Sequence, residues 1–238
     1  MAAVRERLDE LCARHGLPAD KAVQLERLLG LVEHAPVAVT AVRDPAEAVD
    51  VHIADSLAGL EVAALRAVHV IADLGAGAGF PGIPLALALP GARVTLVESV
   101  RKKCDFLERA AVEVGVENVA ICCARAEEWR AGLGRHEAVT ARALAPLAVL
   151  VEYAAPLLVV GGVLVAWKGR PEPEEEVDGA AAAGALGLEL ADVVRVEPFA
   201  GVRERRLYVY RKMRETPAGY PRRAGMARKR PLGAGRAP

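Results

Sequence analysis

Three glycines spaced two residues apart follow an apolar stretch in the first third of the chain. The stretch, Val68–Leu74, is rich in β-branched and other apolar residues, which predicts a strand buried on both faces. Gly75, Gly77 and Gly79 then remove side chains where a backbone turns sharply and lets a ligand approach its amides. Pro81 suits the first turn of a following helix. The run predicts a strand, a ligand-binding loop and a helix, or else a glycine-rich turn that binds nothing.

The glycine spacing fits two kinds of cofactor. Residues 77–82 match the G-x-G-x-x-G pattern of dinucleotide sites. Asp73, two positions before the first glycine, would repel a pyrophosphate and attract a cation. The Asp-x-Gly-x-Gly-x-Gly run resembles the first motif of methyltransferases that use S-adenosylmethionine (SAM), a cofactor with an ammonium, a sulfonium and no phosphate. Glu98 ends the next predicted strand and could accept hydrogen bonds from both ribose hydroxyls, but NAD enzymes also carry an acid there.

Polar side chains also follow the later predicted strands, at the edge of an open α/β sheet where ligands bind. Ala126-Glu127 follows the third strand, where methyltransferases commonly recognise adenine. A glutamate there could equally reflect the dipole of a helix N-terminus. Arg142 follows the fourth strand, and Lys168 follows the fifth, where a lysine could also extend into solvent.

The residues around Arg142 limit the chemistry of the acceptor. The Asn- or Asp-bearing tetrad of enzymes that methylate adenine amino groups is absent, and no cysteine lies at a strand end suited to attack on cytosine. An acceptor that needs no deprotonation remains, such as guanine N7, which requires in-line approach and no general base. Arg142 could pair with O6 and N7 of guanine, with a cofactor carboxylate or with a phosphate.

The composition describes a chain that can bury one large core. It has 238 residues, of which 53% are apolar, and no apolar run reaches the roughly 18 residues that span a bilayer. The charged first 15 residues lack a secretory h-region, so we expect a cytoplasmic protein. The four cysteines show no C-x-x-C spacing, so we expect reduced, buried thiols and no metal site: Cys12, Cys104, Cys122 and Cys123.

The charge is balanced overall and uneven along the chain. Lys and Arg number 31 and Asp and Glu number 31, yet from Gly201 onward twelve basic residues accompany only Glu204 and Glu215. A basic end on a neutral protein indicates a polyanionic partner or a solvated, partly disordered tail. Prolines and glycines beyond Lys212 predict an extended tail without a helix.

Strands and helices alternate regularly after residue 67. We expect helices over 3–15, 20–34, 56–65, 81–89, 101–114, 126–132, 146–158 and 172–186. Asp44-Pro45 would start a further short helix, and Asp55 would cap the helix over 56–65. We expect strands over 68–74, 93–98, 118–123, 137–142, 163–168, 191–197 and 205–211. This order predicts an α/β protein with the Rossmann-like fold of SAM-dependent methyltransferases, whose seven-stranded, mostly parallel sheet ends in an antiparallel hairpin. The predicted domains are an N-terminal helical section (1–66), a methyltransferase domain (67–213) and a basic extended tail (214–238).

Together these motifs resemble the RsmG (GidB) family of bacterial small-subunit ribosomal RNA guanine-N7 methyltransferases, over about residues 35–232. The loop Gly-Ala-Gly-Phe-Pro-Gly-Ile-Pro at 77–84 and the element His-Ile-Ala-Asp-Ser-Leu at 52–57 carry most of the resemblance, and the tail motifs at 220–223 and 230–232 add to it. Two positions depart from the family pattern. Ala38 stands where the family usually has Asn, and Ala76 where it has Thr or Ser.

The resemblance implies a set of site residues. The expected SAM contacts are Asp73, Gly75, Gly77, Gly79, Phe80, Glu98, Ser99, Val100, Ala126, Glu127 and Arg142. Arg142 and Lys168 are the implied catalytic residues, and Arg101, Lys102, Lys103, Lys168 and the basic tail would hold RNA phosphates. The implied substrate is one guanine in the decoding-region loop of 16S rRNA, free or in the small ribosomal subunit, bound by a monomer without metal or membrane. A small-molecule or protein methyltransferase, an NAD-dependent oxidoreductase and a non-catalytic RNA-binding module remain alternatives.

Overall fold

The computed structural model describes residues 2–35, 38–42, 44–170, 172–202 and 204–233. In these residues a seven-stranded sheet has the order β3-β2-β1-β4-β5-β7-β6. The strands are β1 (Val70–Leu74), β2 (Arg93–Glu98), β3 (Val119–Cys123), β4 (His136–Arg142), β5 (Leu158–Lys168), β6 (Leu188–Val196) and β7 (Arg205–Lys212). The pairs among β1 to β5 are parallel, and β7 lies antiparallel between β5 and β6. The predicted fold class, including the terminal antiparallel hairpin, is confirmed.

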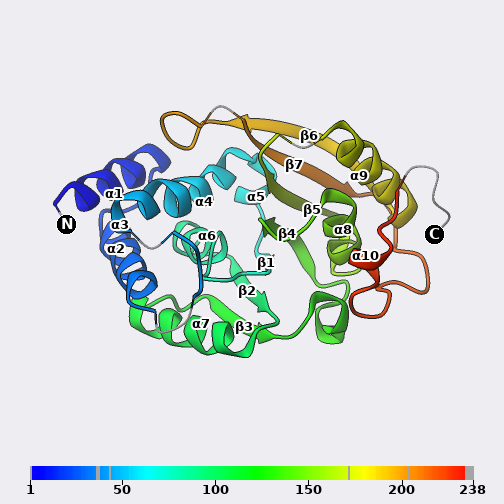
Figure 1. Cartoon of the computed structure of the whole chain (residues 1–238), viewed down its shortest axis with the longest axis horizontal. Helices are drawn as coiled ribbons and strands as arrows, with labels where there is room; N and C mark the ends of the chain where they lie inside the picture. The colour runs from blue at the N-terminus through cyan, green and yellow to red at the C-terminus, as the bar shows by residue number, and fades with distance from the viewer. Residues whose placement is uncertain (1, 36–37, 43, 171, 203, 234–238) are drawn as a thin grey trace.

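Helices cover both faces of the sheet (Figure 1). Two apolar clusters, one on each face, hold the layers together. One face carries α1 (Ala2–His15), α2 (Asp20–Glu33), α3 (Pro45–Ala48), the π-helical turn η1 (Val49–Ala54), α4 (Asp55–Leu57), the 3₁₀ turn η2 (Ala58–Glu61), α5 (Ala63–Arg66), α6 (Gly82–Ala88) and α7 (Arg101–Val114). The other carries α8 (Leu147–Ala154), α9 (Pro173–Leu186) and α10 (Met226–Lys229), with the 3₁₀ turns η3 (Ala126–Glu128) and η4 (Arg130–Gly132) between β3 and β4.

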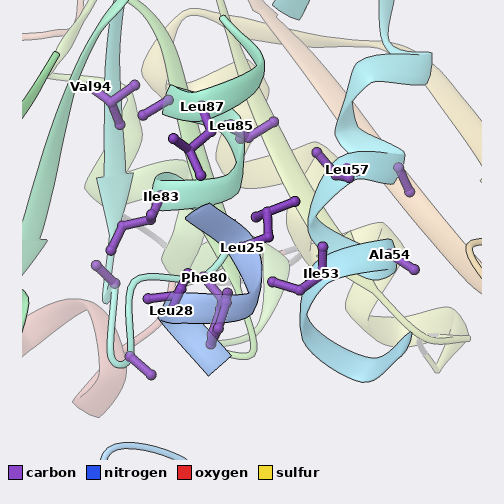
Figure 2. Packing of buried hydrophobic residues seen from close by; sticks show 14 of the residues in the cluster. Leu25, Leu28, Ile53, Ala54, Leu57, Phe80, Ile83, Leu85, Leu87 and Val94 are labelled. Atoms are coloured by element: carbon purple, nitrogen blue, oxygen red, sulfur yellow. The ribbon is translucent and has the colours of Figure 1, made fainter. Parts of the chain in front are cut away.

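The N-terminal helices share one core with the sheet. Figure 2 shows Leu25 and Leu28 of α2 beside Ile53, Leu57 and Ile83, which come from η1, α4 and α6. Each of these side chains is fully buried. Burying apolar side chains contributes about 1.5 to 3 kcal/mol each. This packing fixes the segment 45–66 against the glycine loop, while the predicted domain boundaries stay a prediction.

The segment after α2 confirms one predicted cap and corrects another. Asp44 precedes α3, and its Oδ1 accepts hydrogen bonds from the backbone N–H groups of Ala46 and Glu47. Asp55 does not cap a helix. It lies within a continuous run of helical turns, because η1 extends α3 directly into α4. Its buried carboxylate is therefore free to bind side chains from the sheet.

The tail folds back onto the second face, so the predicted extended conformation is wrong for Met226–Lys229, which form α10. Ala227 and Leu232 are buried in the apolar cluster of α8 and α9. Arg222 donates from Nε to Glu152 of α8 at 2.7 Å. Apolar burial and this ion pair, which the composition of the tail does not reveal, order the segment.

The cysteines differ from the expectation of four reduced thiols. Cys104, in the first turn of α7, and Cys123, at the end of β3, form a disulfide, with Cα atoms 5.8 Å apart. Parallel pairing places Cys123 opposite Glu98 at the end of β2, so the first turn of α7 lies beside the end of β3, which the spacing of 19 residues does not indicate. Cys12 and Cys122 are free, as expected. In the described residues no helix is long and apolar enough to cross a membrane.

Candidate active site

The glycine loop between β1 and α6 has the conformation that glycine allows. Gly75, Gly77 and Gly79 have φ angles of +68°, +58° and +93°, in the left-handed region that other residues rarely adopt. A Cβ on Gly79 would lie 2.5 Å from Cδ1 of Ile83, whereas one on Gly77 would meet no atom closer than 3.8 Å. Gly79 therefore permits close packing of the loop on α6, whereas a Cβ at Gly77 would fit at ordinary van der Waals distance.

Asp73 is fully buried beneath this loop. Its Oδ2 accepts a hydrogen bond of 3.0 Å from the N–H of Gly82, the first residue of α6, and its Oδ1 accepts one of 2.8 Å from the Thr140 hydroxyl. Burial raises the pKa of Asp73 to about 7, against the opposing effect of these hydrogen bonds. In dinucleotide sites the first N–H groups of this helix face the pyrophosphate. Here a carboxylate occupies that position, which fits a cofactor without phosphate.

Glu98 connects the end of β2 to the same loop. Its Oε1 accepts from the N–H groups of Ser99 and Val100, at 2.7 and 2.8 Å, and its Oε2 accepts from the N–H of Gly77 at 3.1 Å. A carboxylate offers about four acceptor positions, so capacity for a further donor remains. The carboxylate lies at the expected strand end, and its contact with a ribose stays a prediction.

Two cavities open beside the loop and share Gly75 as a wall. The large cavity has a volume of about 470 Å³, and the small cavity about 240 Å³. The predicted residues that line the small cavity are Gly75, Ser99, Ala126 and Glu127. Those that line the large one are Gly75, Gly77, Phe80, Arg142 and Lys168. The other predicted cofactor residues line neither cavity and lie behind or beside them: Asp73, Gly79, Glu98 and Val100.

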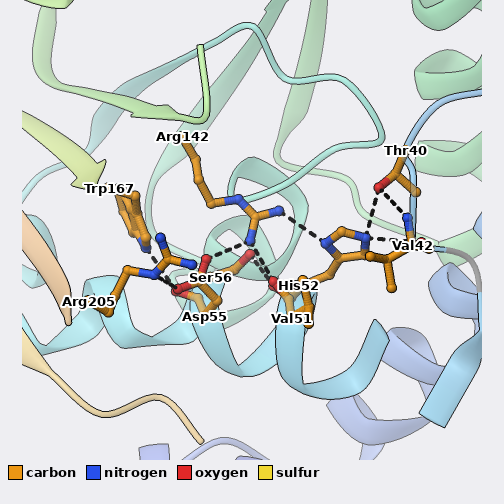
Figure 3. Close-up of polar contacts among 9 residues, drawn as sticks. All are labelled: Thr40, Val42, Val51, His52, Asp55, Ser56, Arg142, Trp167 and Arg205. Carbon is orange, nitrogen blue, oxygen red and sulfur yellow. Dashed lines mark hydrogen bonds and ion pairs between the residues drawn. The ribbon is translucent and has the colours of Figure 1, made fainter. Parts of the chain in front are cut away.

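Arg142, at the end of β4, is the centre of a polar cluster in the large cavity (Figure 3). Its NH1 donates to Oδ2 of Asp55 at 2.8 Å and to the carbonyl of Val51 at 3.0 Å. Arg205 of β7 approaches the other oxygen, with Nε 2.7 Å from Oδ1 of Asp55 in an ion pair. The indole of Trp167 donates to the backbone carbonyl of Asp55 at 2.8 Å. One buried carboxylate therefore holds two arginines from separate strands at the cavity wall.

His52 fixes the other side of the guanidinium. Its Nδ1 lies 3.3 Å from NH2 of Arg142, and its Nε2 lies 3.0 Å from the Thr40 hydroxyl and 3.2 Å from the Val42 carbonyl. Burial, reinforced by the charge of Arg142, lowers the pKa of His52 to about 4. Because an arginine can only donate, the neutral ring accepts at Nδ1 and carries its proton on Nε2. The ring stacks on Phe80 with centroids 4.6 Å apart.

The family model described as rRNA small subunit methyltransferase G (GidB) matches residues 22–201. The chain belongs to this family. The ribosomal RNA small subunit methyltransferase G of Rubrobacter xylanophilus is 44% identical over 203 residues, which cover 83% of this chain and 78% of that protein. The protein of the same name from Carboxydothermus hydrogenoformans is 39% identical over 237 residues, 95% of this chain and 99% of its own. The resemblance inferred from the motifs is confirmed.

Solved structures of other methyltransferases share the fold of this GidB-family chain. A SAM-dependent methyltransferase from Aquifex aeolicus superposes with a TM-score of 0.56 at 15% identity, over 71% of this chain and 94% of that one. A predicted O-methyltransferase from Agrobacterium tumefaciens superposes with a TM-score of 0.51 at 27% identity, over 68% and 80%. The fold is thus that of SAM-dependent methyltransferases.

The sequence pattern does not reveal the partners of Arg142 in this GidB-family protein. It places Asp55 at a helix cap and gives no separate role to His52, Trp167 or Arg205. The spacing of His52 and Asp55, three residues apart on a helical turn, places both on one face and is a usable signal. The contributions of Trp167 and Arg205 depend on how β5 and β7 pair, and motif spacing does not reveal that.

The other basic residues predicted for the site differ in their ion-pair partners and in their exposure to solvent. Lys168 lines the large cavity and forms an ion pair with Glu175 of α9 at 2.5 Å. Arg101 pairs with Asp105 at 3.0 Å on the surface of α7, and Lys102 is exposed beside it. Within the part of the chain that the structure describes, no cluster of three His, Cys, Asp or Glu side chains could hold a metal ion.

Proposed function

We propose that this protein is a cytoplasmic SAM-dependent methyltransferase that methylates N7 of one guanine in the decoding-region loop of 16S rRNA. Family membership supports the reaction class and the ribosomal RNA substrate. In the structure, the observation that carries the proposal is the pair of cavities that share Gly75 at the carboxyl end of the sheet. A cofactor whose adenosine occupied the small cavity would present its methyl group to the large one.

The residues of the two cavities suit their proposed ligands. Bound SAM would supply an electrophilic methyl group on a sulfonium. Glu127 and the backbone at Ala126 would hold the adenine, and Glu98 the ribose. Gly75 and Gly77 carry no side chain where the cofactor must pass. Asp73 favours SAM over NAD, because its carboxylate accepts the N–H of Gly82 at the start of α6, where a pyrophosphate would bind.

The large cavity suits an acceptor that needs orientation alone. Guanine N7 has a free lone pair at neutral pH, so the protein must align it with the methyl group and need not remove a proton. Arg142 would donate toward O6 and leave the N7 lone pair free, and Asp55 and His52 hold its guanidinium in place for that purpose. Asp55 is paired with two arginines and His52 is held neutral with both ring nitrogens engaged. Neither side chain is placed to act as a general base.

Methyl transfer from radiolabelled SAM tests the proposal. The protein is incubated with small ribosomal subunits and with deproteinised 16S rRNA, both from a strain that lacks the modification, and the labelled base is identified after digestion. Label in 7-methylguanine from one site is the expected result. No incorporation into either RNA, or label in another base, would contradict the proposed acceptor.

Arg142→Ala separates turnover from folding. The variant should lower kcat on RNA by about 100-fold or more, because a misplaced acceptor loses much of the advantage of alignment. Arg93→Ala is the matched control, since Arg93 is exposed at the amino end of β2, on the opposite edge of the sheet. Equal activity of the two variants would show that Arg142 has no role in the methyl-transfer step.

A further inference from the structure

The tail forms one wall of the small cavity, beside residues from β1, β2 and the β3–η3 segment. Arg228 of α10 lines this cavity together with Glu127 and Tyr153, and its NH2 donates to the carbonyl of Leu144 at 2.8 Å. Burial and the charge of Glu127 raise the pKa of the Tyr153 phenol, and Arg228 acts in the opposite direction. The guanidinium of Arg228 therefore faces the same small space as the acid proposed to recognise adenine.

The position of Arg228 is fixed by several contacts of the tail with the core. The N–H of Gly225 donates to Oε1 of Glu127 at 2.9 Å. Ala227 is buried against α8, and Arg222 pairs with the buried carboxylate of Glu152 through Nε and NH2. The residues that precede Arg228 in the tail are thus anchored, and the backbone of the tail itself orients one oxygen of Glu127.

A guanidinium at this wall of the small cavity could stack on an adenine ring bound in the cavity. Arginine stacks on aromatic faces through its flat, weakly hydrated guanidinium, which lysine lacks. The hydrogen bond to Leu144 holds one edge of the guanidinium and leaves its face available. Glu127 on the same cavity would meet the edge of the ring, so the two side chains would recognise different parts of the base.

We propose that Arg228 is a cofactor-binding residue that covers the adenine of SAM, so that the basic tail belongs to the cofactor pocket and is not solely an RNA-binding extension. This inference rests on the proposed function, since it takes SAM as the ligand of the small cavity. It assigns one residue of α10 to the cofactor. Arg228 and Lys229 are both exposed, and of the two only Arg228 lines the cavity.

Equilibrium binding without RNA tests this assignment. Dissociation constants for S-adenosylhomocysteine and for 5′-methylthioadenosine, which lacks the amino-acid portion, are measured by calorimetry on the full chain. Arg228→Ala should weaken both ligands by the same factor, about tenfold, because the lost contact is to the shared adenosine. Arg228→Lys should retain the charge and lose most of the stacking, so it should bind closer to the alanine variant than to the wild type.

Lys229→Ala is the matched control, because it removes the same charge from the neighbouring position of the same helix. It should leave both dissociation constants unchanged. Equal affinity of wild type and Arg228→Ala would overturn the assignment, and so would a loss confined to S-adenosylhomocysteine, which would place the contact at the amino-acid end. Failure of the wild-type protein to bind either nucleoside would instead refute the proposed cofactor. The melting temperature of each variant without ligand identifies any loss caused by unfolding.

Discussion

At the scale of single residues, Asp73 shows how a binding motif can act through the backbone. Its carboxylate makes two hydrogen bonds, both internal, and it reaches neither cavity. Its position under the loop ties β1 to the first residue of α6 and takes the amide that would otherwise bind an anion. A charge at this depth still acts on a nearby cation, since the surrounding core screens it weakly.

Burial of Asp73 predicts a dependence of stability on pH. The folded-state pKa of about 7 exceeds the ordinary aspartate value of 3.8, so this group favours the folded state fully below about pH 4, and that contribution is lost as pH rises to about 7. Asp73→Asn keeps both hydrogen-bonding positions and cannot ionise. The variant should therefore gain stability relative to the wild type between about pH 5 and pH 8, by about 3 kcal/mol.

Urea unfolding at a series of pH values measures this difference. Asp105→Asn, at an exposed position on α7, is the control for removing a carboxylate elsewhere. If the stabilities of wild type and Asp73→Asn run parallel over this range, Asp73 does not change its protonation with folding.

At the scale of elements, two glycines of the loop between β1 and α6 have different structural roles. Gly79 has a positive φ and also lies against Ile83, whereas Gly77 has a positive φ beside open space of the large cavity. One glycine serves the packing of the element, and the other serves access to the site.

Alanine at each position should therefore have a different main effect. Gly79→Ala should lose about 3 kcal/mol of unfolding free energy, from the left-handed backbone and from displacement of Ile83. Gly77→Ala should lose only about 1 kcal/mol, and it should weaken binding of S-adenosylhomocysteine more than its loss of stability explains. Chemical unfolding and calorimetry on the two variants measure both quantities. Equal losses of stability would mean that the contact with Ile83 relaxes without cost.

At the scale of the whole molecule, segments from both ends of the chain return to the same edge of the sheet. Thr40, His52 and Asp55 reach the large cavity from the N-terminal side, and the tail reaches the small cavity from the other face. The central βα units supply the glycine loop and the strand ends. The candidate site is therefore completed by segments that lie outside the predicted methyltransferase domain.

The ion pair between Arg222 and Glu152 should be the main electrostatic anchor of the tail. Glu152 is 1% exposed, so Arg222→Ala leaves a buried carboxylate without its cation. The variant should lose about 3 kcal/mol of unfolding free energy. Arg223→Ala, at the exposed neighbouring position, should change stability by less than about 0.5 kcal/mol. Denaturant unfolding of both variants is the measurement, and similar midpoints would show that other contacts hold the tail.

The sequence by itself determined the order of strands and helices, the glycine loop and the strand ends that carry Glu98, Glu127 and Arg142. These features follow from local periodicity and from chemistry within a few residues, so they are visible without a structure. Tertiary packing decided the rest. Asp55 contacts Arg142 and Arg205, and Arg228 lines the same cavity as Glu127, because sheet pairing and the returning tail bring together residues that are distant along the chain. No local pattern encodes those distances, since burial and sheet register set them only when the chain has folded.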